Sequence, residues 1–265
     1  MNRTHRIAPK LSQNWNEVAT RIRANCRIVV FLDFDGTLVD IAPRPDQVHL
    51  RADTRKVLRR LCNRSRAELV VISGRRRREL LQHIDVPGIR YFGIYGFERT
   101  NHSSLPRAAS AALRAICKEL TGLDSLFPGL WVEDKHFSLS VHLLAVPKTR
   151  QQGARRAVRS IARPVRRTLR IIENIRDMEI VPRLIRDKGA AVREFLRKPQ
   201  NRQALPLYLG DDLSDESGFA AIPAGVSIRV GSSRPTKAAY SVCDPNEVAV
   251  VLRKLDDILA ETTPS

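Results

Sequence analysis

The chain has 265 residues, of which 43% are hydrophobic and 28% charged, enough for one large domain or two small ones of ordinary globular composition. No segment reaches the ~18 consecutive apolar residues of a membrane-spanning helix, and no apolar signal segment follows the basic N-terminus. We therefore expect a cytoplasmic protein that makes no membrane contact. The formal net charge of +18 attracts polyanions and small anionic substrates alike, so charge alone identifies no partner.

The cysteines are scattered along the chain at four positions: Cys26, Cys62, Cys117 and Cys243. No two of them form a C-x-x-C pair and no histidine lies at metal-ligand spacing, which excludes a zinc knuckle. We expect four reduced thiols rather than a disulfide framework.

The first hundred residues alternate between apolar strands and amphipathic helices. A weak helical period over residues 11–26 leads into an apolar run, residues 28–32, which lacks polar alternation and suits a strand buried on both faces of a parallel sheet. The alternation continues with a helix at about 53–63, a strand at 69–72, a short helix at 76–84 and a strand at 91–94. This order predicts a doubly wound α/β sheet.

The segment from about residue 104 to 183 has a different pattern. It contains two helices, each followed by two β-like runs: helices at 106–120 and 149–162, strands at 130–132, 138–144, 168–172 and 178–181. In the run 138–144 apolar and polar residues alternate, as in a half-exposed antiparallel strand. The segment is therefore predicted to form a separate α+β unit inserted into the first domain.

The α/β pattern then returns to the end of the chain. Its elements are a helix at 188–196, a strand at 205–209, a further helix, a strand at 226–230 and a last helix that starts at Asp244-Pro245. The predicted fold class is α/β: a doubly wound parallel-sheet core, residues 1–103 and 184–265, with a smaller α+β domain inserted at residues 104–183.

Polar motifs follow three of the predicted strands. They are Asp33-Phe34-Asp35-Gly36-Thr37, Ser73-Gly74-Arg75 and Gly210-Asp211-Asp212-Leu213-Ser214-Asp215. Each motif alone also fits a simple turn or an acid-rich helix start. Ligands bind at the carboxyl ends of strands in such sheets, and carboxylates gathered there need a hard cation. Oxygen ligands favour Mg²⁺.

Together these motifs resemble the haloacid-dehalogenase (HAD) superfamily of phosphohydrolases, whose first motif is D-x-D-G-T, and most closely its trehalose-phosphatase family. The likeness extends from residue 32 through Ile41-Ala42-Pro43 to Pro45-Asp46. Residues 93–99 are similar to the family's G-x-H-G-x-E-R segment, and residues 178–183 with Lys188-Gly189 are similar to its E-I-x-P-x…K-G segment. Covering about residues 28–235, the resemblance implies a HAD-like core with an α+β cap domain that closes over the substrate.

The resemblance also implies hydrolysis of trehalose 6-phosphate, the last step of trehalose biosynthesis, through an aspartyl-phosphate. Asp33 would be the nucleophile, and Asp35 would protonate the leaving sugar oxygen and then deprotonate water. Mg²⁺ would be held by Asp33, Asp211 and the backbone carbonyl of Asp35. Lys188 would add positive charge, and Ser73 would donate a hydrogen bond to a phosphate oxygen.

Further residues take supporting roles in the same resemblance. Asp212 and Asp215 would orient the metal ligands. The expected substrate contacts are Asp33, Phe34, Asp35, Gly74 and Arg75 in the core, and Glu133, Lys135, Glu179 and Arg183 in the cap. Each cap residue also fits an ordinary solvated strand position.

The sequence departs from the family pattern at positions that would contact the sugar and determine which sugar is bound. Tyr95 replaces the histidine of G-x-H-G-x-E-R, Phe97 replaces a small residue, and His136 replaces the glycine of the cap's E-x-K-G segment. None of these positions belongs to the phosphate machinery. Phosphatase chemistry is therefore the firmer expectation, and the identity of the sugar remains open.

A basic stretch between residues 147 and 170 holds nine Lys and Arg and no acidic residue. It fits either a polyanion-binding face or a solvated helix. The lack of interleaved aromatic residues and of any nucleic-acid motif favours the helix and no nucleic-acid partner.

Three functions stay open: a trehalose-6-phosphate phosphatase, a phosphatase of another sugar phosphate such as sucrose 6-phosphate or glucosylglycerol phosphate, and a non-enzymatic polyanion-binding protein. P-loop enzymes and Rossmann dehydrogenases are excluded because their glycine motifs are absent. For the enzyme we expect a monomer with a small sugar phosphate as its partner.

Overall fold

The computed structural model describes residues 6–42, 44–100, 103–231 and 233–261. The basic residues 1–5 and Pro43 of the family-like stretch lie outside the described residues. The chain divides into two compact units, one formed by residues 1–99 and 187–265 and the other by residues 100–186. The sequence placed these boundaries at 103/104 and 183/184, a few residues inside the second unit.

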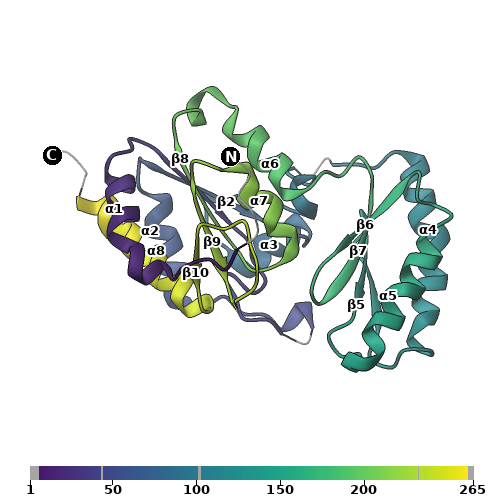
Figure 1. The fold of residues 1–265 in the computed structure, drawn as a ribbon. Coiled ribbons are helices and arrows are strands. Elements are labelled where there is room, and N and C mark those ends of the chain that lie inside the picture. The colour runs from purple at the N-terminus through teal and green to yellow at the C-terminus, as the bar shows by residue number, and fades with distance from the viewer. Residues whose placement is uncertain (1–5, 43, 101–102, 232, 262–265) are drawn as a thin grey trace. The chain divides into compact units, whose positions relative to one another are not determined.

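The first unit, called here the parallel-sheet unit, is built on a six-stranded sheet with the order β10-β9-β8-β1-β2-β3 (Figure 1). Its strands are β1 Ile28–Leu32, β2 Ala67–Ile72, β3 Arg90–Phe92, β8 Leu205–Gly210, β9 Val226–Val230 and β10 Tyr240–Val242. All five pairings are parallel, and β1 lies between β2 and β8. The doubly wound prediction is confirmed, with β10 as an additional strand.

Helices cover both faces of this sheet because the strands are apolar on both sides. Val30 and Leu32 of β1 pack on one side, while Val29 and Phe31 pack on the other. Burying a side chain of this size stabilises the fold by about 1.5–3 kcal/mol. The first face carries α1 Trp15–Arg23, α2 Ala52–Cys62, α3 Arg77–Ile84 and α8 Pro245–Glu261, and the second α6 Lys188–Leu196 and α7 Glu216–Ala221.

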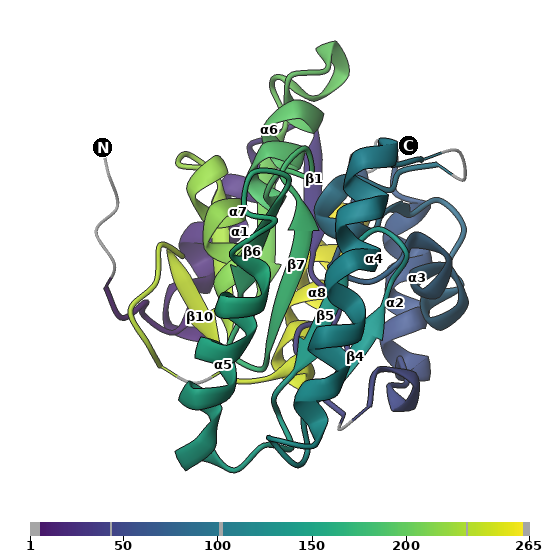
Figure 2. The same cartoon turned by 90° about the vertical axis from the view of Figure 1, so that its right-hand side faces the viewer.

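The second unit, the antiparallel unit, is a four-stranded sheet of order β4-β5-β7-β6 covered by two helices. Figure 2 shows the helices lying across one face of the sheet. The elements are α4 Arg107–Thr121, β4 Trp131–Asp134, β5 Leu139–His142, α5 Lys148–Ala162, β6 Leu169–Glu173 and β7 Asp177–Pro182. Every pairing is antiparallel, and the predicted order of two helices and four strands is confirmed.

Two local predictions are wrong. The strand expected to reach residue 94 ends at Phe92, because Ile94 and Tyr95 take left-handed backbone angles (φ 48° and 58°). The polar side of β5 is not exposed to water, since Ser138 and Ser140 are fully buried. Ser138, just before β5, donates a hydrogen bond to a buried carboxylate, that of Glu179, so this polar position belongs to a buried network rather than to a solvated face.

Short 3₁₀ turns connect several elements: η1 Leu11–Asn14, η2 Pro45–Gln47, η3 Ile94–Gly96, η4 Gly122–Asp124, η5 Pro199–Asn201 and η6 Leu213–Asp215. The last helix begins as predicted, with the Asp244 carboxylate accepting a hydrogen bond from the Glu247 N–H at 3.0 Å. All four cysteines are free. No helix in the described part of the chain has both the length and the apolar character needed to cross a bilayer.

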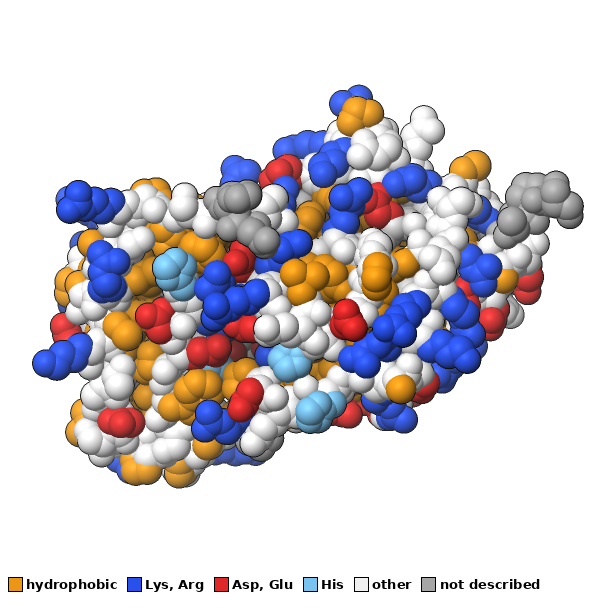
Figure 3. Space-filling view, turned by 180° about the vertical axis from the view of Figure 1, so that it is seen from behind, with side chains coloured by type: hydrophobic (Ala, Val, Ile, Leu, Met, Phe, Trp, Pro, Cys, Tyr) orange, Lys and Arg blue, Asp and Glu red, His pale blue; other side chains and the backbone are white. Residues whose placement is uncertain are grey.

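The positive charge is widely distributed. Lys and Arg side chains are spread over the face shown in Figure 3, with Asp and Glu side chains between them. On α5, Arg159 binds the Glu173 carboxylate through two hydrogen bonds of 2.8 Å, and Arg155 lies 3.8 Å from the same carboxylate. Part of the basic stretch is therefore neutralised within its own unit.

Candidate active site

The three strand-end motifs meet at one edge of the parallel sheet. Leu32, the last residue of β1, is in register with Val71 of β2 and Leu209 of β8, so the residues that follow these strands are neighbours. The Asp33 N–H donates a hydrogen bond to the Leu209 carbonyl at 3.0 Å. The parallel register thereby brings together segments that are far apart in the sequence.

Lys188 lies at the centre of this edge. Its Nζ is 2.7 Å from Oδ1 of Asp33 and 2.7 Å from Oδ1 of Asp215. Carboxylate oxygens of Asp33, Asp211 and Asp215 lie within 4.8 Å of one another, and all three residues are buried. Lys188 is the first residue of α6, and the Asp187 carboxylate before it caps the helix through the Ala190 N–H at 2.7 Å.

The electrostatics of the cluster follow from burial. Burial raises the pKa of Asp33 well above its ordinary value; the Lys188 ammonium opposes this shift, and the Asp215 and Asp211 carboxylates add to it. Burial lowers the pKa of Lys188, but the Asp215 and Asp33 carboxylates outweigh it, so the pKa stays above the ordinary lysine value. The Lys188 ammonium group thus lies between two carboxylates, and the Asp211 carboxylate lies beside them.

This donor set fits a divalent cation. It consists of oxygen atoms only, which hard cations prefer, and it brings carboxylate oxygens of three residues within 4.8 Å of one another. Gly36 keeps the site open on the Asp211 side: a Cβ at this position would lie 2.3 Å from Oδ2 of Asp211, and φ is +81°. Any larger residue would displace the carboxylate.

Asp215 and Asp212 have different surroundings. The Asp215 carboxylate also accepts hydrogen bonds from the Tyr208 hydroxyl at 2.8 Å and from the N–H groups of Asp211 and Asp212 at 3.1 and 3.0 Å. It therefore braces the loop that carries Asp211. The Asp212 carboxylate is turned to the start of η6, where it accepts the Leu213 N–H.

Asp35 is held by Arg75. The guanidinium Nε and Nη2 of Arg75 lie 2.7 Å from the two oxygens of the Asp35 carboxylate, and the same group lies 5.2 Å from the centre of the Phe34 ring. The Arg75 side chain is 6% exposed, whereas that of Asp35 is 36% exposed. The Asp35 carboxylate thus remains partly open to solvent, unlike the buried Asp33, Asp211 and Asp215.

The remaining core predictions are placed as follows. The Ser73 Oγ accepts the Arg75 N–H at 3.2 Å, so its hydroxyl hydrogen is available for another acceptor. The ring of Phe34 is fully buried, which leaves only its backbone for a ligand. A Cβ at Gly74 would lie 3.1 Å from the Tyr95 hydroxyl, so the small residue makes room for that ring.

Sequence reasoning missed three side chains that support the cluster. Tyr208 bonds to Asp215, and Arg229 and Arg234 both donate to the backbone carbonyl of Asp211, at 3.3 and 2.9 Å. A buried arginine inside the apolar run of β9 is a signal that could have identified Arg229. An aromatic residue in a strand gives no such signal, because it fits any core.

In the antiparallel unit, three of the four expected cap residues lie together. Lys135 Nζ is 3.1 Å from the Glu179 carboxylate and 4.0 Å from that of Glu133. Burial lowers the pKa of Lys135, but Glu179 and Glu133 outweigh it and the pKa is raised. Arg183 lies apart: it is exposed, and its Nε donates to the Arg166 carbonyl at 2.7 Å.

A residue missed in this unit is His142. Its Nε2 lies 2.9 Å from the Glu133 carboxylate, and its ring stacks on Trp131 with centroids 3.9 Å apart. His136 stands where the family pattern has glycine, and its backbone has a left-handed φ of 67°, a conformation in which glycine is least strained. His136 is stabilised there by donating its N–H to the Asp134 carboxylate at 2.7 Å.

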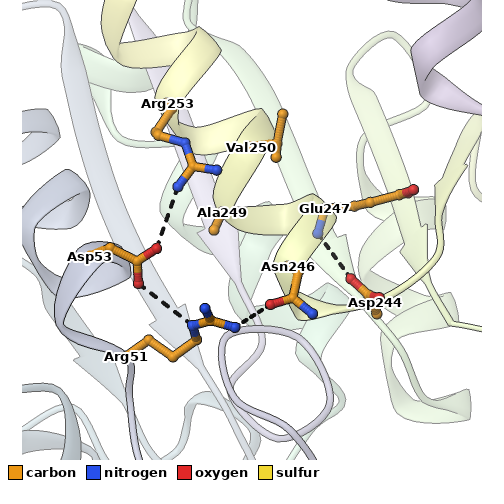
Figure 4. A pocket seen from close by; sticks show the side chains of 8 residues that line it. All are labelled: Arg51, Asp53, Asp244, Asn246, Glu247, Ala249, Val250 and Arg253. Carbon is orange, nitrogen blue, oxygen red and sulfur yellow. Dashed lines mark hydrogen bonds and ion pairs between the residues drawn. The ribbon is translucent and has the colours of Figure 1, made fainter.

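One further hollow, of about 280 Å³, lies in the parallel-sheet unit at the starts of α2 and α8 (Figure 4). Asp53 is 3.6 Å from Arg51 and 3.5 Å from Arg253, and Arg51 also bonds to Asn246. The hollow contains none of the residues predicted to act on a substrate. Its charges are already paired, so it does not present a site for a phosphate.

A parallel sheet of this kind, covered by helices on both faces and with aspartates after the first and a late strand, defines the haloacid-dehalogenase class of fold. The C-terminal domain of a Candida albicans trehalose-6-phosphate phosphatase has the same fold, with a TM-score of 0.84 and 19% identity over 95% of this chain and 99% of that domain. At this identity the likeness establishes the fold alone.

The sequence profile of the trehalose-phosphatase family matches residues 31–246, and the chain belongs to this family. It is 34% identical to a trehalose-phosphate phosphatase of Mycobacterium tuberculosis over 246 residues, which covers 88% of this chain and 62% of the relative. It is 30% identical to a trehalose 6-phosphate phosphatase of Zea mays, covering 86% of this chain and 70% of the relative. The chain thus spans less than two thirds of the mycobacterial relative's length. Membership of a phosphatase family implies a divalent metal, in agreement with the buried acidic triad.

Proposed function

We propose that this protein is a Mg²⁺-dependent phosphatase that hydrolyses trehalose 6-phosphate to trehalose and phosphate, the last step of trehalose biosynthesis. The observation that carries the proposal is the buried cluster in which Lys188 lies 2.7 Å from both Asp33 and Asp215, beside Asp211. A phosphate monoester is a dianion, so a carboxylate nucleophile can approach it only where other groups offset the negative charge.

Asp33 is the proposed nucleophile. One of its carboxylate oxygens forms a bond to phosphorus while the bond from phosphorus to the sugar oxygen breaks, giving an aspartyl-phosphate. Asp35, which binds Arg75 as a carboxylate in this structure, takes up a proton from solvent and gives it to the departing sugar oxygen. It then takes a proton from a water molecule that attacks phosphorus, which releases inorganic phosphate and restores Asp33. The partial exposure of Asp35 suits a group that exchanges protons with substrate and water in turn.

Mg²⁺ would be held by Asp33, Asp211 and the backbone carbonyl of Asp35, and when bound it supplies the positive charge that lets the two anions meet. Lys188 adds a second fixed positive charge. Ser73 donates a hydrogen bond to a phosphate oxygen. Asp215 keeps Lys188 and the Asp211 loop in place, and Asp212 stabilises the same loop through its cap.

The antiparallel unit is proposed to act as the cap that closes over the sugar. Glu133, Lys135 and Glu179 combine donors and acceptors, which suits a disaccharide whose hydroxyl groups are both. Arg183 is proposed as a further contact through the guanidinium nitrogens that it does not use on the Arg166 carbonyl. Water is excluded from the reacting groups when such a lid closes.

The test is release of inorganic phosphate from trehalose 6-phosphate, sucrose 6-phosphate, glucosylglycerol phosphate and glucose 6-phosphate, with Mg²⁺ and with excess chelator. Metal-dependent turnover that strongly favours the trehalose ester supports the proposal. A preference for another ester keeps the mechanism and changes the substrate. Absence of turnover on all four contradicts the proposal and favours a polyanion-binding protein.

We further propose that the enzyme is a cytoplasmic monomer. Its elution on size exclusion, compared with the 29.9 kDa mass of one chain, tests the oligomeric state. Cell fractionation of the native protein tests its location.

A further inference from the structure

The segment that follows β3 is folded tightly against the turn that carries Arg75. The Tyr95 N–H donates to the Ser73 carbonyl at 2.8 Å, and the Ile94 N–H donates to the Arg75 carbonyl at 2.9 Å. Both bonds require the left-handed angles of Ile94 and Tyr95. For a β-branched residue such an angle costs about 1–2 kcal/mol, so the surrounding contacts must hold this segment in place.

Glu98 closes the segment. Its carboxylate is buried and accepts the Arg77 N–H at 2.7 Å and the Arg76 guanidinium at 2.9 and 3.1 Å. The backbones of Glu98 and Gly93 are joined by two hydrogen bonds, of 2.9 and 3.0 Å. A Cβ at Gly93 would lie 2.4 Å from the Arg77 nitrogen and 2.8 Å from the Arg75 oxygen, so the two segments pack without space between them.

These contacts form one continuous path to the proposed acid. Glu98 fixes the backbone at Arg76 and Arg77, this backbone continues into Arg75, and the Arg75 guanidinium binds both oxygens of Asp35 at 2.7 Å. The Arg75 side chain is itself buried. Its orientation is therefore set by its backbone and by the Phe34 ring, which its guanidinium faces at 5.2 Å. A shift of the turn would therefore rotate or release the Asp35 carboxylate.

We propose that Glu98 is a positioning residue for proton transfer: it holds the 75–77 backbone so that Arg75 keeps the Asp35 carboxyl group in the orientation from which, once it carries a proton, it protonates the leaving oxygen. The inference rests on the proposed function, because it gives Asp35 that role. Glu98 acts through its neighbours: its carboxylate binds Arg76 and the Arg77 N–H, and Arg75 makes the contact with Asp35.

The leaving group provides a test that separates positioning from general stability. An alkoxide leaving group needs a proton from Asp35, whereas p-nitrophenolate leaves without one. We expect Glu98→Gln to lower kcat/KM for the best sugar phosphate by about tenfold and for p-nitrophenyl phosphate by less than about twofold. In an Asp35→Asn background the same substitution should cause no further loss.

Glu194→Gln is the matched control. It breaks a second Arg–Glu pair with two hydrogen bonds, of 2.6 and 3.0 Å, and its arginine, Arg99, is the residue after Glu98. It should leave both substrates unchanged. If Glu98→Gln does not fold, Arg76→Gln carries the test, since it keeps the bond from the Arg77 N–H to Glu98.

Three outcomes are decisive. Equal losses on the two esters, or no loss on either, contradict the positioning role. A selective loss on the sugar ester supports it. If the wild-type protein turns over no sugar phosphate, the proposed function itself is contradicted before any variant is compared. The role of Glu98 is then contradicted as well.

Discussion

Each unit of the molecule contains a buried lysine beside carboxylates, and the two lysines have different electrostatic surroundings. Lys188 of the parallel-sheet unit lies 2.7 Å from Asp33 and Asp215, and Lys135 of the antiparallel unit lies 3.1 Å from Glu179. In both cases carboxylates raise the lysine pKa despite burial. Both lysines therefore remain charged at neutral pH.

The two sites differ in the groups that surround their carboxylates. At Lys188 a third carboxylate, that of Asp211, joins the cluster, and the three carboxylates form a set of oxygen ligands that suits a hard cation. At Lys135 the two glutamates are met by other donors, the His142 ring and the Ser138 hydroxyl. This difference supports the proposal that the parallel-sheet unit binds a cation and a phosphate, and that the antiparallel unit offers hydrogen bonds to the hydroxyl groups of a sugar.

The largest effect is expected when the negative cluster loses its nucleophile. Asp33→Asn should lower kcat for the sugar phosphate by about 10⁴-fold or more, because an amide cannot form the aspartyl-phosphate. Phosphate release measures the loss, and circular dichroism checks that the variant is folded. Turnover close to wild type would exclude the proposed mechanism.

Removal of the metal should be the next largest effect. A chelator in excess should lower kcat by about 10³-fold, since the metal supplies several kcal/mol of charge stabilisation, and added Mg²⁺ should restore activity. A second measurement is independent of turnover: Mg²⁺ at a hundred times its dissociation constant should stabilise the fold by about 2.7 kcal/mol. Asp211→Asn should abolish this stabilisation, and a variant that keeps it would show that the cation binds elsewhere.

The two lysines can be compared directly by the same substitution. Lys188→Met should reduce kcat/KM for both a sugar phosphate and p-nitrophenyl phosphate, by about 10²–10³-fold, because a charge that faces the transition state is lost. Lys135→Met should raise KM for the sugar phosphate by about tenfold and leave p-nitrophenyl phosphate unchanged, because that ester has no sugar to bind. Equal responses of the two variants would contradict the division of roles.

The stability of the antiparallel unit gives a further comparison. Lys135→Met leaves Glu179 buried without its cation and should cost about 3 kcal/mol in the free energy of unfolding. Urea denaturation measures the difference. Replacing an exposed partner should lower the free energy of unfolding much less. Glu173→Gln, which breaks the ion pair with Arg159 on α5, should lower it by about 0.5 kcal/mol or less.

The smallest effect concerns pH. Because the pKa of Lys135 is raised in the folded state, its stabilising charge is fully present below the ordinary lysine pKa of about 10.4 and is lost only as the pH rises through the higher folded pKa. The difference in unfolding free energy between wild type and Lys135→Met should therefore stay constant from pH 6 to 9, within about 0.5 kcal/mol. A decline toward zero by pH 9 would contradict the raised pKa.

Sequence reasoning was accurate where local pattern decides structure. The apolar run of β1 required burial on both faces, and its five residues are all buried. The separate α+β character of the second unit followed from its order, in which each of two helices is followed by two short strands. The pattern failed at Ile94, because nothing in an apolar β-branched residue indicates a left-handed turn, and at Ser138, because a serine in a strand is compatible with either water or a buried carboxylate.

What the sequence determined by itself was the position of the polar motifs: each follows an apolar strand, so a parallel sheet had to bring Asp33, Ser73 and Asp211 to one edge. Tertiary structure decided which side chains pair there. Lys188 binds Asp33, which is 155 residues away in the sequence, and Arg75 binds Asp35, which is 40 residues away. The contacts of Glu98 with the turn at residues 75–77 are also not indicated by any pattern in the neighbouring sequence. Such pairings depend on the distances between packed elements, which residue types and spacing along the chain do not encode.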